Sequence, residues 1–187
     1  MLIAFHKPYG VLSQFTSDGS PNRTLADFRF PPLVYPIGRL DADSEGLLLF
    51  SDEKSLNVRL LLPENEHRRV YWVQVERVPS LLDLSKVERG VVVQGYRTKP
   101  CKARLIIPPN LPERTPPIRF RKNIPTAWIE LELTEGKNRQ VRRMTASIGF
   151  PTLRLIRVQI GNFHLGDLAQ GTWRTLSDAE RSTVFGK

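Results

Sequence analysis

A short polar stretch carries the residues with the clearest chemical potential in this chain. It reads G-R-L-D-A-D-S-E-G over residues 38–46 and holds one arginine, Arg39, and three carboxylates, Asp41, Asp43 and Glu45. A carboxylate in a confined loop can act as a nucleophile or a general base. Loops of this composition are also common as solvated turns and helix caps. The spacing alone leaves both roles open, and it also allows glycosidase-like hydrolysis by Asp41 with Asp43 or Glu45.

Apolar segments flank this loop on both sides. Val34, Tyr35 and Ile37 predict the end of a strand before it, and the continuous apolar run over residues 47–50 predicts a buried strand after it. Glycines at both ends permit a turn through positive φ or the close approach of another backbone. The sequence therefore predicts a rigid polar loop held between two buried strands, where reactive groups can be fixed in place.

A second group of candidate residues lies on a helix that we expect from Asn138 to about Gly149. Three apolar residues at i, i+3 and i+7 predict its buried side: Val141, Met144 and Ile148. Three arginines fall on the opposite side: Arg139, Arg142 and Arg143. Like charges on one helical face repel each other, so this side is either a solvated basic face or a site where phosphate or a buried carboxylate relieves the repulsion.

Four motifs occur in this chain in the order found in one known enzyme family. They are H-K-P-Y-G-V-L-S-Q-F (6–15), G-R-L-D with S-E-G-L-L-L (38–49), R-V-Y-W-V-Q-V-E (69–76) and E-G-K-N-R-Q-V-R-R-M (135–144). With these motifs the chain resembles the RsuA/RluB/RluE/RluF family of pseudouridine synthases. Two further stretches are most similar to its RluE-type members, P-P-I-R-F-R-K-N-I-P-T-A-W (116–128) and G-F-P-T-L-R-L-I-R (149–157).

The resemblance implies roles for individual residues. Asp41 matches the family's catalytic aspartate, and Tyr71 matches its active-site tyrosine, which stacks on the uracil. From its alternating strand alone, Tyr71 would be assigned to the core. Arg142 aligns with the basic residue that pairs with the aspartate in the wider superfamily and keeps it ionised. Leu155 corresponds to an apolar residue that packs under the target base in related synthases.

Basic residues outside these roles are candidate RNA contacts. Those that we expect to bind substrate are Arg39, Arg119, Arg121, Lys122, Arg139 and Arg143, and Lys7 and Arg23 are further candidates. Arg39 could instead serve as a structural hydrogen-bond donor inside its loop.

The resemblance also implies a reaction and a partner. We expect isomerisation of one uridine in large-subunit (23S) ribosomal RNA, as naked RNA or in a pre-ribosomal particle, by a monomeric enzyme. Asp41 would act as a nucleophile or by removing the C2′ proton. A non-catalytic RNA-binding or ribosome-assembly protein, and a synthase for another RNA, are the alternatives. We expect no cofactor and no metal, because the sequence contains no clustered His/Cys pattern, no P-loop and no G-x-G-x-x-G.

Composition limits the partners and the compartment. The 187 residues carry a formal net charge of +9, which favours nucleic acid over an acidic membrane, although a merely basic protein has the same balance. A single cysteine, Cys101, excludes an intrachain disulfide and fits a reducing compartment. No apolar run is long enough to span a membrane, and the N-terminus lacks a signal-peptide pattern. We therefore expect a cytoplasmic protein that does not bind membranes.

The periodicity along the chain predicts an α+β fold rich in strands. Strands are expected at 2–5, 11–15, 34–37, 47–50, 70–78, 126–133, 152–160 and 172–176, with two short ones between 91 and 107. Helical segments are expected at 24–28, from an Asp52 cap to 62, at 80–89, at 138–149 and after Ser177, and residues 108–125 should form an exposed, proline-rich excursion.

The family fold agrees with this interpretation. It is a mixed, mostly antiparallel sheet with flanking helices and a central RNA-binding cleft. We expect one catalytic domain over residues 1–187, which could divide into two lobes within residues 63–69, and no N-terminal RNA-binding domain of the S4 type.

Overall fold

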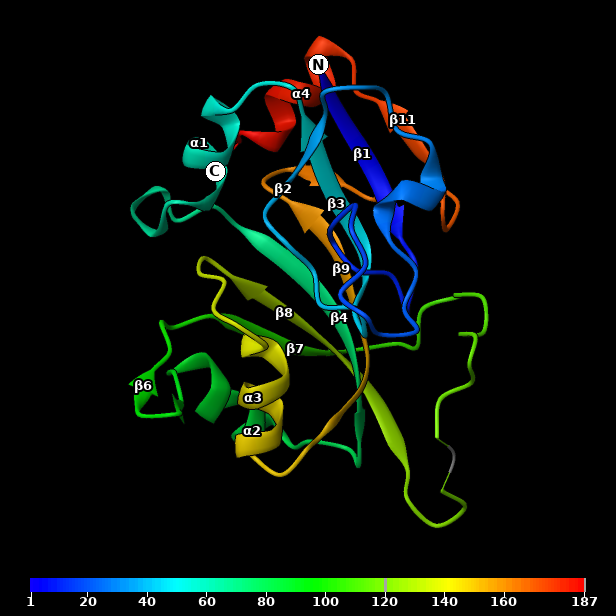
Figure 1. Ribbon diagram of the computed structural model, residues 1–187. Helices are drawn as coiled ribbons and strands as arrows, with labels where there is room; N and C mark the ends of the chain where they lie inside the picture. The colour runs from blue at the N-terminus through cyan, green and yellow to red at the C-terminus, as the bar shows by residue number, and fades with distance from the viewer. Residues whose placement is uncertain (120, 187) are drawn as a thin grey trace. The chain divides into compact units, whose positions relative to one another are not determined.

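The structure is a computed structural model that describes residues 1–119 and 121–186, in two compact units (Figure 1). The first unit comprises Met1–Arg68 with Ile156–Lys187, and the second comprises Arg69–Leu155. The first crossing between units, after Arg68, lies inside the range 63–69. The return after Leu155 falls within a strand, where no sequence pattern indicates a boundary. Each unit is described by itself.

The first unit is built on a sheet with strand order β11-β1-β3-β9, in which β2 also pairs with β3 and β10 with β9. Its strands are β1 (Leu2–Lys7), β2 (Tyr35–Ile37), β3 (Glu45–Ser51), β9 (Thr152–Ile160), β10 (Phe163–His164) and β11 (Trp173–Thr175). Its helical elements are η1 (Leu25–Phe28), α1 (Ser55–Leu61), η2 (Pro63–Asn65) and α4 (Asp178–Val184). β3 pairs with β1 and β2 antiparallel and with β9 parallel.

The β1–β3 pair is buried on both faces. Leu47 and Leu49 belong to one apolar cluster, whereas Leu48 and Phe50 belong to another, and all four are at most 1% exposed. Successive side chains of a strand point to opposite faces, so a strand covered on both sides needs a continuous apolar run. The buried strand predicted over residues 47–50 is therefore confirmed.

Two local expectations for the first unit are wrong. Residues 11–15 form no strand: Val11 makes a single bridge with Arg23, and the backbone follows the neighbouring loop, with Leu12 N–H bonding Arg23 O at 2.9 Å. Asp52 does not cap α1, whose N-cap is Lys54 without a side-chain bond. The Asp52 carboxylate accepts a hydrogen bond from the amino group of Met1 at 2.7 Å, so a long-range partner replaces the local one.

The second unit holds a three-stranded antiparallel sheet of order β4-β8-β7, from β4 (Arg69–Glu76), β8 (Thr126–Leu133) and β7 (Lys102–Ile106). It also contains α2 (Leu81–Glu88), α3 (Gln140–Ser147) and a small hairpin of β5 (Val92–Val93) and β6 (Tyr96–Arg97). The sequence predicts two short strands between 91 and 107, where the structure has three. The β8 prediction is confirmed over its whole length.

The two faces of β4 differ as its alternation predicts. Tyr71, Val73 and Val75 are buried in a cluster to which α2 and α3 also contribute, whereas the residues between them are only half-buried. The predicted start of α2 at Ser80 is confirmed by a capping box with Asp83, and the same motif at Ser177 begins α4. Residues 108–119 and 121–125 contain no helix or strand, as expected for the excursion.

Within the described residues, no helix is long and apolar enough to cross a membrane.

Candidate active site

The loop of Asp41 is held by its backbone on both sides of the aspartate. Ser13, which is buried, accepts a hydrogen bond from Leu40 N–H at 3.0 Å and donates one to Leu40 O at 2.7 Å. On the other side, Gly10 N–H donates to Ala42 O at 2.8 Å. A turn between Asp41 O and Ser44 N–H, at 3.0 Å, closes the loop. Asp41 thus lies between two anchored residues, and its side chain remains half-buried.

Lys7 lies beneath this loop and is completely buried. Its ammonium donates to Val11 O at 2.7 Å, to Pro8 O at 3.0 Å and to Ala42 O at 3.4 Å. Burial lowers the pKa of Lys7 to about 7, against the opposing effects of the Glu45, Asp43 and Asp41 carboxylates. The expectation that Lys7 contacts RNA is therefore wrong, because the residue is an internal anchor of the Asp41 loop.

The strand after the loop begins where another backbone comes very close. Gly46 has φ +103°, and a Cβ at this position would lie 2.3 Å from the backbone oxygen of Arg157 on β9. Glu45, paired with Ile156 across the parallel ladder, is 1% exposed and accepts a hydrogen bond from Gln170 at 3.1 Å. Glu45 is therefore an internal group of the sheet.

The second unit holds Tyr71, Leu155 and Arg142. Tyr71 is 7% exposed and belongs with Leu155 to the same apolar cluster, as does Val141, the neighbour of Arg142. Arg142 is half-buried on α3, and its Nε atom lies fully buried. The structure thus brings the tyrosine, the apolar residue and the first turn of the basic helix into one cluster of this unit.

A buried carboxylate fixes the start of α3. Glu135 accepts hydrogen bonds from the Tyr96 hydroxyl at 2.6 Å, from Lys99 N–H at 2.9 Å and from the Gln140 amide. The Gln140 amide oxygen in turn accepts from Lys137 N–H at 2.9 Å. This network ties the β5–β6 hairpin to the first residue of the helix and positions Arg142 two residues later. The helix begins at Gln140 rather than Asn138, because Arg139 adopts a left-handed backbone with φ 50°.

The candidate RNA contacts have different surroundings. Arg39 is exposed, and its guanidinium donates to the Gln14 side chain at 3.2 Å. Arg139 is exposed ahead of α3 rather than on its face, and Arg143 donates to the Asn138 side chain at 2.9 Å. Three others are exposed on the proline-rich excursion: Arg119, Arg121 and Lys122. Among the described residues, no group of three or more His, Cys, Asp or Glu is arranged to hold a metal ion.

Comparison with known proteins places the chain in a family. The family model described as RNA pseudouridylate synthase matches residues 1–147. This protein belongs to the RNA pseudouridylate synthase family. A relative from Xanthomonas campestris, "Ribosomal large subunit pseudouridine synthase E", is 52% identical over 176 residues, covering 93% of this chain and 94% of the relative. The family assignment made from the four motifs is therefore confirmed, including the similarity to RluE-type members.

More distant members of the family also match almost the whole length of this chain. "Dual-specificity RNA pseudouridine synthase RluF" of Escherichia coli K12 is 32% identical over 185 residues, which is 99% of this chain and 57% of that protein. A crystal structure of a pseudouridylate synthase superimposes with a TM-score of 0.79 over 98% of this chain and 73% of the other, at 24% identity. The α+β synthase fold expected from the sequence is thereby confirmed.

Sequence reasoning missed the internal role of Lys7 in this synthase. The available signal was its position two residues after the apolar run L-I-A-F at residues 2–5, which places it at the end of a buried strand. The role of Ser13 as a clamp left no signal, because its partner Leu40 lies 27 residues away.

Proposed function

We propose that this protein isomerises a specific uridine in large-subunit (23S) ribosomal RNA to pseudouridine, with Asp41 as the catalytic residue. The observation that carries this proposal is the similarity, along almost the whole chain, to relatives named for that activity. They include the Xanthomonas protein and one from Vibrio parahaemolyticus that is 49% identical over 94% of this chain. The anchoring of the Asp41 loop at Leu40 and Ala42 supports the residue assignment.

The reaction rearranges one glycosidic bond. The N1–C1′ bond breaks, the uracil turns, and a C5–C1′ bond forms. The C5 proton is then lost and N1 gains a proton, so there is neither net oxidation nor net hydrolysis, and no cofactor is required. Asp41 serves either as a nucleophile toward the sugar or as the base that removes the C2′ proton. The loop anchors hold its carboxylate in place for either step.

The second unit contributes the groups that handle the base. Tyr71 stacks on the uracil, Leu155 packs under it, and Arg142 pairs with the catalytic carboxylate as the reaction centre loses water. The buried cluster that contains Tyr71 and Leu155 supplies the apolar surroundings such a base needs. The hydrogen bonds of Glu135 and Gln140 fix the start of α3 and thereby the position of Arg142.

Binding of the RNA relies on charge. A phosphate backbone suits the net charge of +9 and the candidate contacts, of which Arg143 is half-buried and the others are exposed: Arg39, Arg119, Arg121, Lys122 and Arg139. We propose 23S ribosomal RNA, free or in an assembling particle, as the partner of a monomeric cytoplasmic enzyme. The target nucleotide must leave its stack to expose C5 and the glycosidic bond, which costs roughly a few kcal/mol.

Two measurements test the proposal. Pseudouridine mapping of ribosomal RNA from cells without this gene should show one site lost, and the purified protein should restore it. Asp41→Asn should abolish tritium release from RNA labelled at uridine C5 while retaining RNA affinity, and the matched change Asp43→Asn should retain activity. Substantial turnover by Asp41→Asn would contradict the assignment of the catalytic residue, and unchanged mapping would contradict the substrate.

A synthase for more than one RNA is the second candidate. It is favoured by the match over 99% of this chain to the E. coli protein named a dual-specificity RNA pseudouridine synthase. Mapping of total RNA, rather than ribosomal RNA alone, separates the two candidates, because only the second predicts a further lost site outside the ribosome. A non-catalytic assembly protein predicts no lost site at all.

A further inference from the structure

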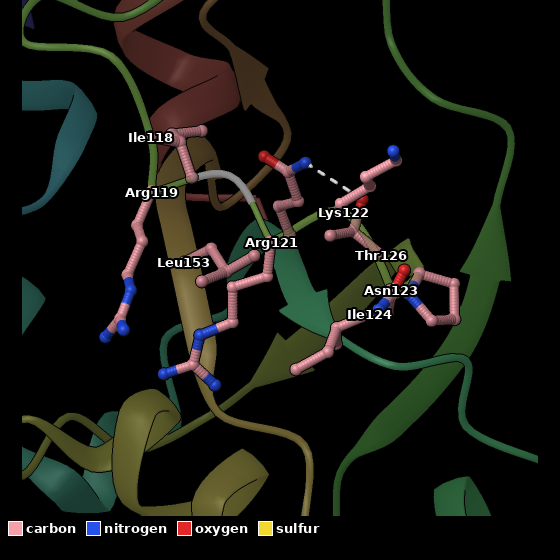
Figure 2. A pocket seen from close by; sticks show the side chains of 10 residues that line it. Ile118, Arg119, Arg121, Lys122, Asn123, Ile124, Thr126 and Leu153 are labelled. Carbon is pink, nitrogen blue, oxygen red and sulfur yellow. Dashed lines mark hydrogen bonds between the residues drawn. The ribbon is translucent and has the colours of Figure 1, made fainter.

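A hollow of about 500 Å³ opens in the second unit (Figure 2). It is lined by Gln74 of β4, Leu153 of β9 and residues of the excursion with the first residue of β8: Ile118, Arg119, Arg121, Lys122, Asn123, Ile124, Pro125 and Thr126. Gln74 lies on the half-buried face of β4, opposite the buried Tyr71 face. None of the residues that line the hollow belongs to the apolar cluster of Tyr71 and Leu155, so the hollow is separate from that cluster.

The lining combines three kinds of group. Ile118, Ile124 and Leu153 provide apolar side chains, while Gln74 and Asn123 provide amides that can both donate and accept hydrogen bonds. Gln74 Nε2 donates to the Thr126 hydroxyl at 3.2 Å, which orients its amide (Figure 2). A site that needed only to hold a phosphate would not require apolar walls, whereas a flat heterocycle with polar edges needs both kinds of surface.

Positively charged side chains also line the hollow. Figure 2 shows the Arg119 and Arg121 side chains extending to the same side and Lys122 extending to the other. Arg121 lies 3.4 Å from the Glu76 carboxylate. In the part of the chain that the structure describes, no carboxylate pairs with Arg119 or Lys122, so net positive charge remains on both sides of the hollow. Phosphates on either side of one nucleotide would balance it.

Hydrogen bonds from two arginines fix the excursion that forms most of the hollow. The Arg114 guanidinium donates to Pro116 O at 2.9 Å, to Pro117 O at 3.2 Å and to Leu153 O at 3.4 Å. Arg154 donates to Pro112 O at 3.0 Å. Prolines further restrict this segment, so little conformational entropy remains to be lost on binding. The hollow is therefore preorganised for a ligand.

We propose that this hollow binds one nucleotide of the RNA other than the reacting uridine, unstacked from its neighbours. Its base contacts Ile118, Ile124 and Leu153, its edge bonds the Gln74 and Asn123 amides, and its phosphates lie near Arg119 and Lys122. A volume of about 500 Å³ falls in the range of small-ligand sites and excludes a base-paired duplex. The inference rests on the proposed function in that it takes RNA as the substrate.

Methyl NMR of the whole protein tests the site directly. With isoleucine δ1 methyls labelled, hexauridylate should shift the Ile118 and Ile124 signals through the ring current of a bound base. Ile107, which is 89% exposed and outside the hollow, is the matched control and should not move. A ribose–phosphate chain of the same length without bases should leave all three signals nearly unchanged. Ile124→Ala should weaken hexauridylate binding at least about fivefold, the lower end of what one stacked base contributes.

Salt dependence tests the phosphate contacts. Arg119→Ala and Lys122→Ala should each reduce the slope of log affinity against log salt by about 0.7, the value per phosphate for single strands. Arg97→Ala, which removes an exposed arginine on the β5–β6 hairpin, should leave the slope unchanged.

Three outcomes would overturn the inference: no shift of the Ile118 and Ile124 methyls at saturation, equal shifts with the baseless chain, or no binding of hexauridylate. Pseudouridine formation by the wild-type protein is measured separately. If the protein makes pseudouridine but these methyls do not move, the nucleotide site is wrong and the proposed function stands. If the methyls move but no pseudouridine forms, the proposed function is wrong.

Discussion

Replacing Lys7 by methionine should remove a specific part of the pH dependence of stability. In the folded protein the pKa of Lys7 is lowered from 10.5 to about 7, mainly because the side chain is buried. Between these values the unfolded chain binds a proton that the folded protein does not, so raising the pH favours the folded state. The free energy of unfolding should therefore rise with pH between about 7 and 10.5 in the wild type, and this contribution is absent in Lys7→Met.

The size of the effect follows from the shift. A change of 3.5 pKa units, from 10.5 to about 7, corresponds to about 5 kcal/mol in full at 1.36 kcal/mol per unit. Between about pH 7.5 and 9.5, the wild-type minus Lys7→Met difference should grow by roughly 2 to 3 kcal/mol. At every pH the variant also loses the donor to Pro8 O and Val11 O, whereas Ala42 O keeps its hydrogen bond from Gly10 N–H.

Urea unfolding of both proteins at several pH values measures the difference, with a constant m-value as a check on two-state behaviour. Lys54→Met is the control, because Lys54 is exposed and its removal should leave the pH profile parallel to that of the wild type. If the profiles of wild type and Lys7→Met are parallel from about pH 7 to 10, then Lys7 is not titrating with a lowered pKa and the reasoning is wrong.

Three further outcomes are expected. Arg142→Ala should lower the single-turnover rate at saturating RNA by about 100-fold or more, as for a buried ion pair that loses one partner, and Arg142→Lys should recover little because lysine lacks the planar guanidinium. Arg143→Ala, in contrast, should keep the rate, and a normal saturated rate in Arg142→Ala would make that residue a phosphate contact only. Activity should persist after dialysis against EDTA, because the isomerisation involves no net redox or hydrolytic step; a loss restored only by a divalent ion that does not act by folding the RNA would argue otherwise. Gly46→Ala should lower the free energy of unfolding by more than about 3 kcal/mol, because the added Cβ would lie 2.3 Å from Arg157 O. Gly10→Ala is the control, because no atom lies within 4 Å of its Cβ, and it should cost about 1–2 kcal/mol. Similar urea midpoints for the two variants would contradict the close approach at Gly46.

Local signals in the sequence predicted several elements correctly. The alternation in residues 126–133 predicted β8, and that in residues 70–78 predicted β4, which ends at Glu76. The Ser80 and Ser177 motifs predicted the starts of α2 and α4. The two capping motifs succeed because their hydrogen bonds join residues three positions apart. The alternation succeeds because successive side chains of a strand point to opposite faces. The four motifs likewise identified the family, since each can be read from contiguous residues.

Long-range partners account for the expectations that failed. Residues 11–15 were expected to form a strand, yet their backbone bonds the loop at Arg23 to Leu25 instead. Asp52 stands where a cap is expected, but it bonds the amino group of Met1, 51 residues away. In both cases a hydrogen bond to a residue distant in sequence formed in place of the interaction that the local pattern predicted.

The sequence by itself determined the family, the α+β class and the candidate residues Asp41, Tyr71 and Arg142, because motifs and periodicity are properties of contiguous residues. Only the tertiary structure decided that Lys7 is an internal anchor rather than an RNA contact, since its burial depends on carbonyls contributed by residues 8, 11 and 42. It also decided that the excursion forms a hollow, because Arg114 of the excursion donates to Leu153 O, 39 residues away, and Arg154 donates to Pro112 O of the excursion, 42 residues away. Burial and hydrogen bonding at such separations arise only when the chain is folded, and no local pattern encodes them.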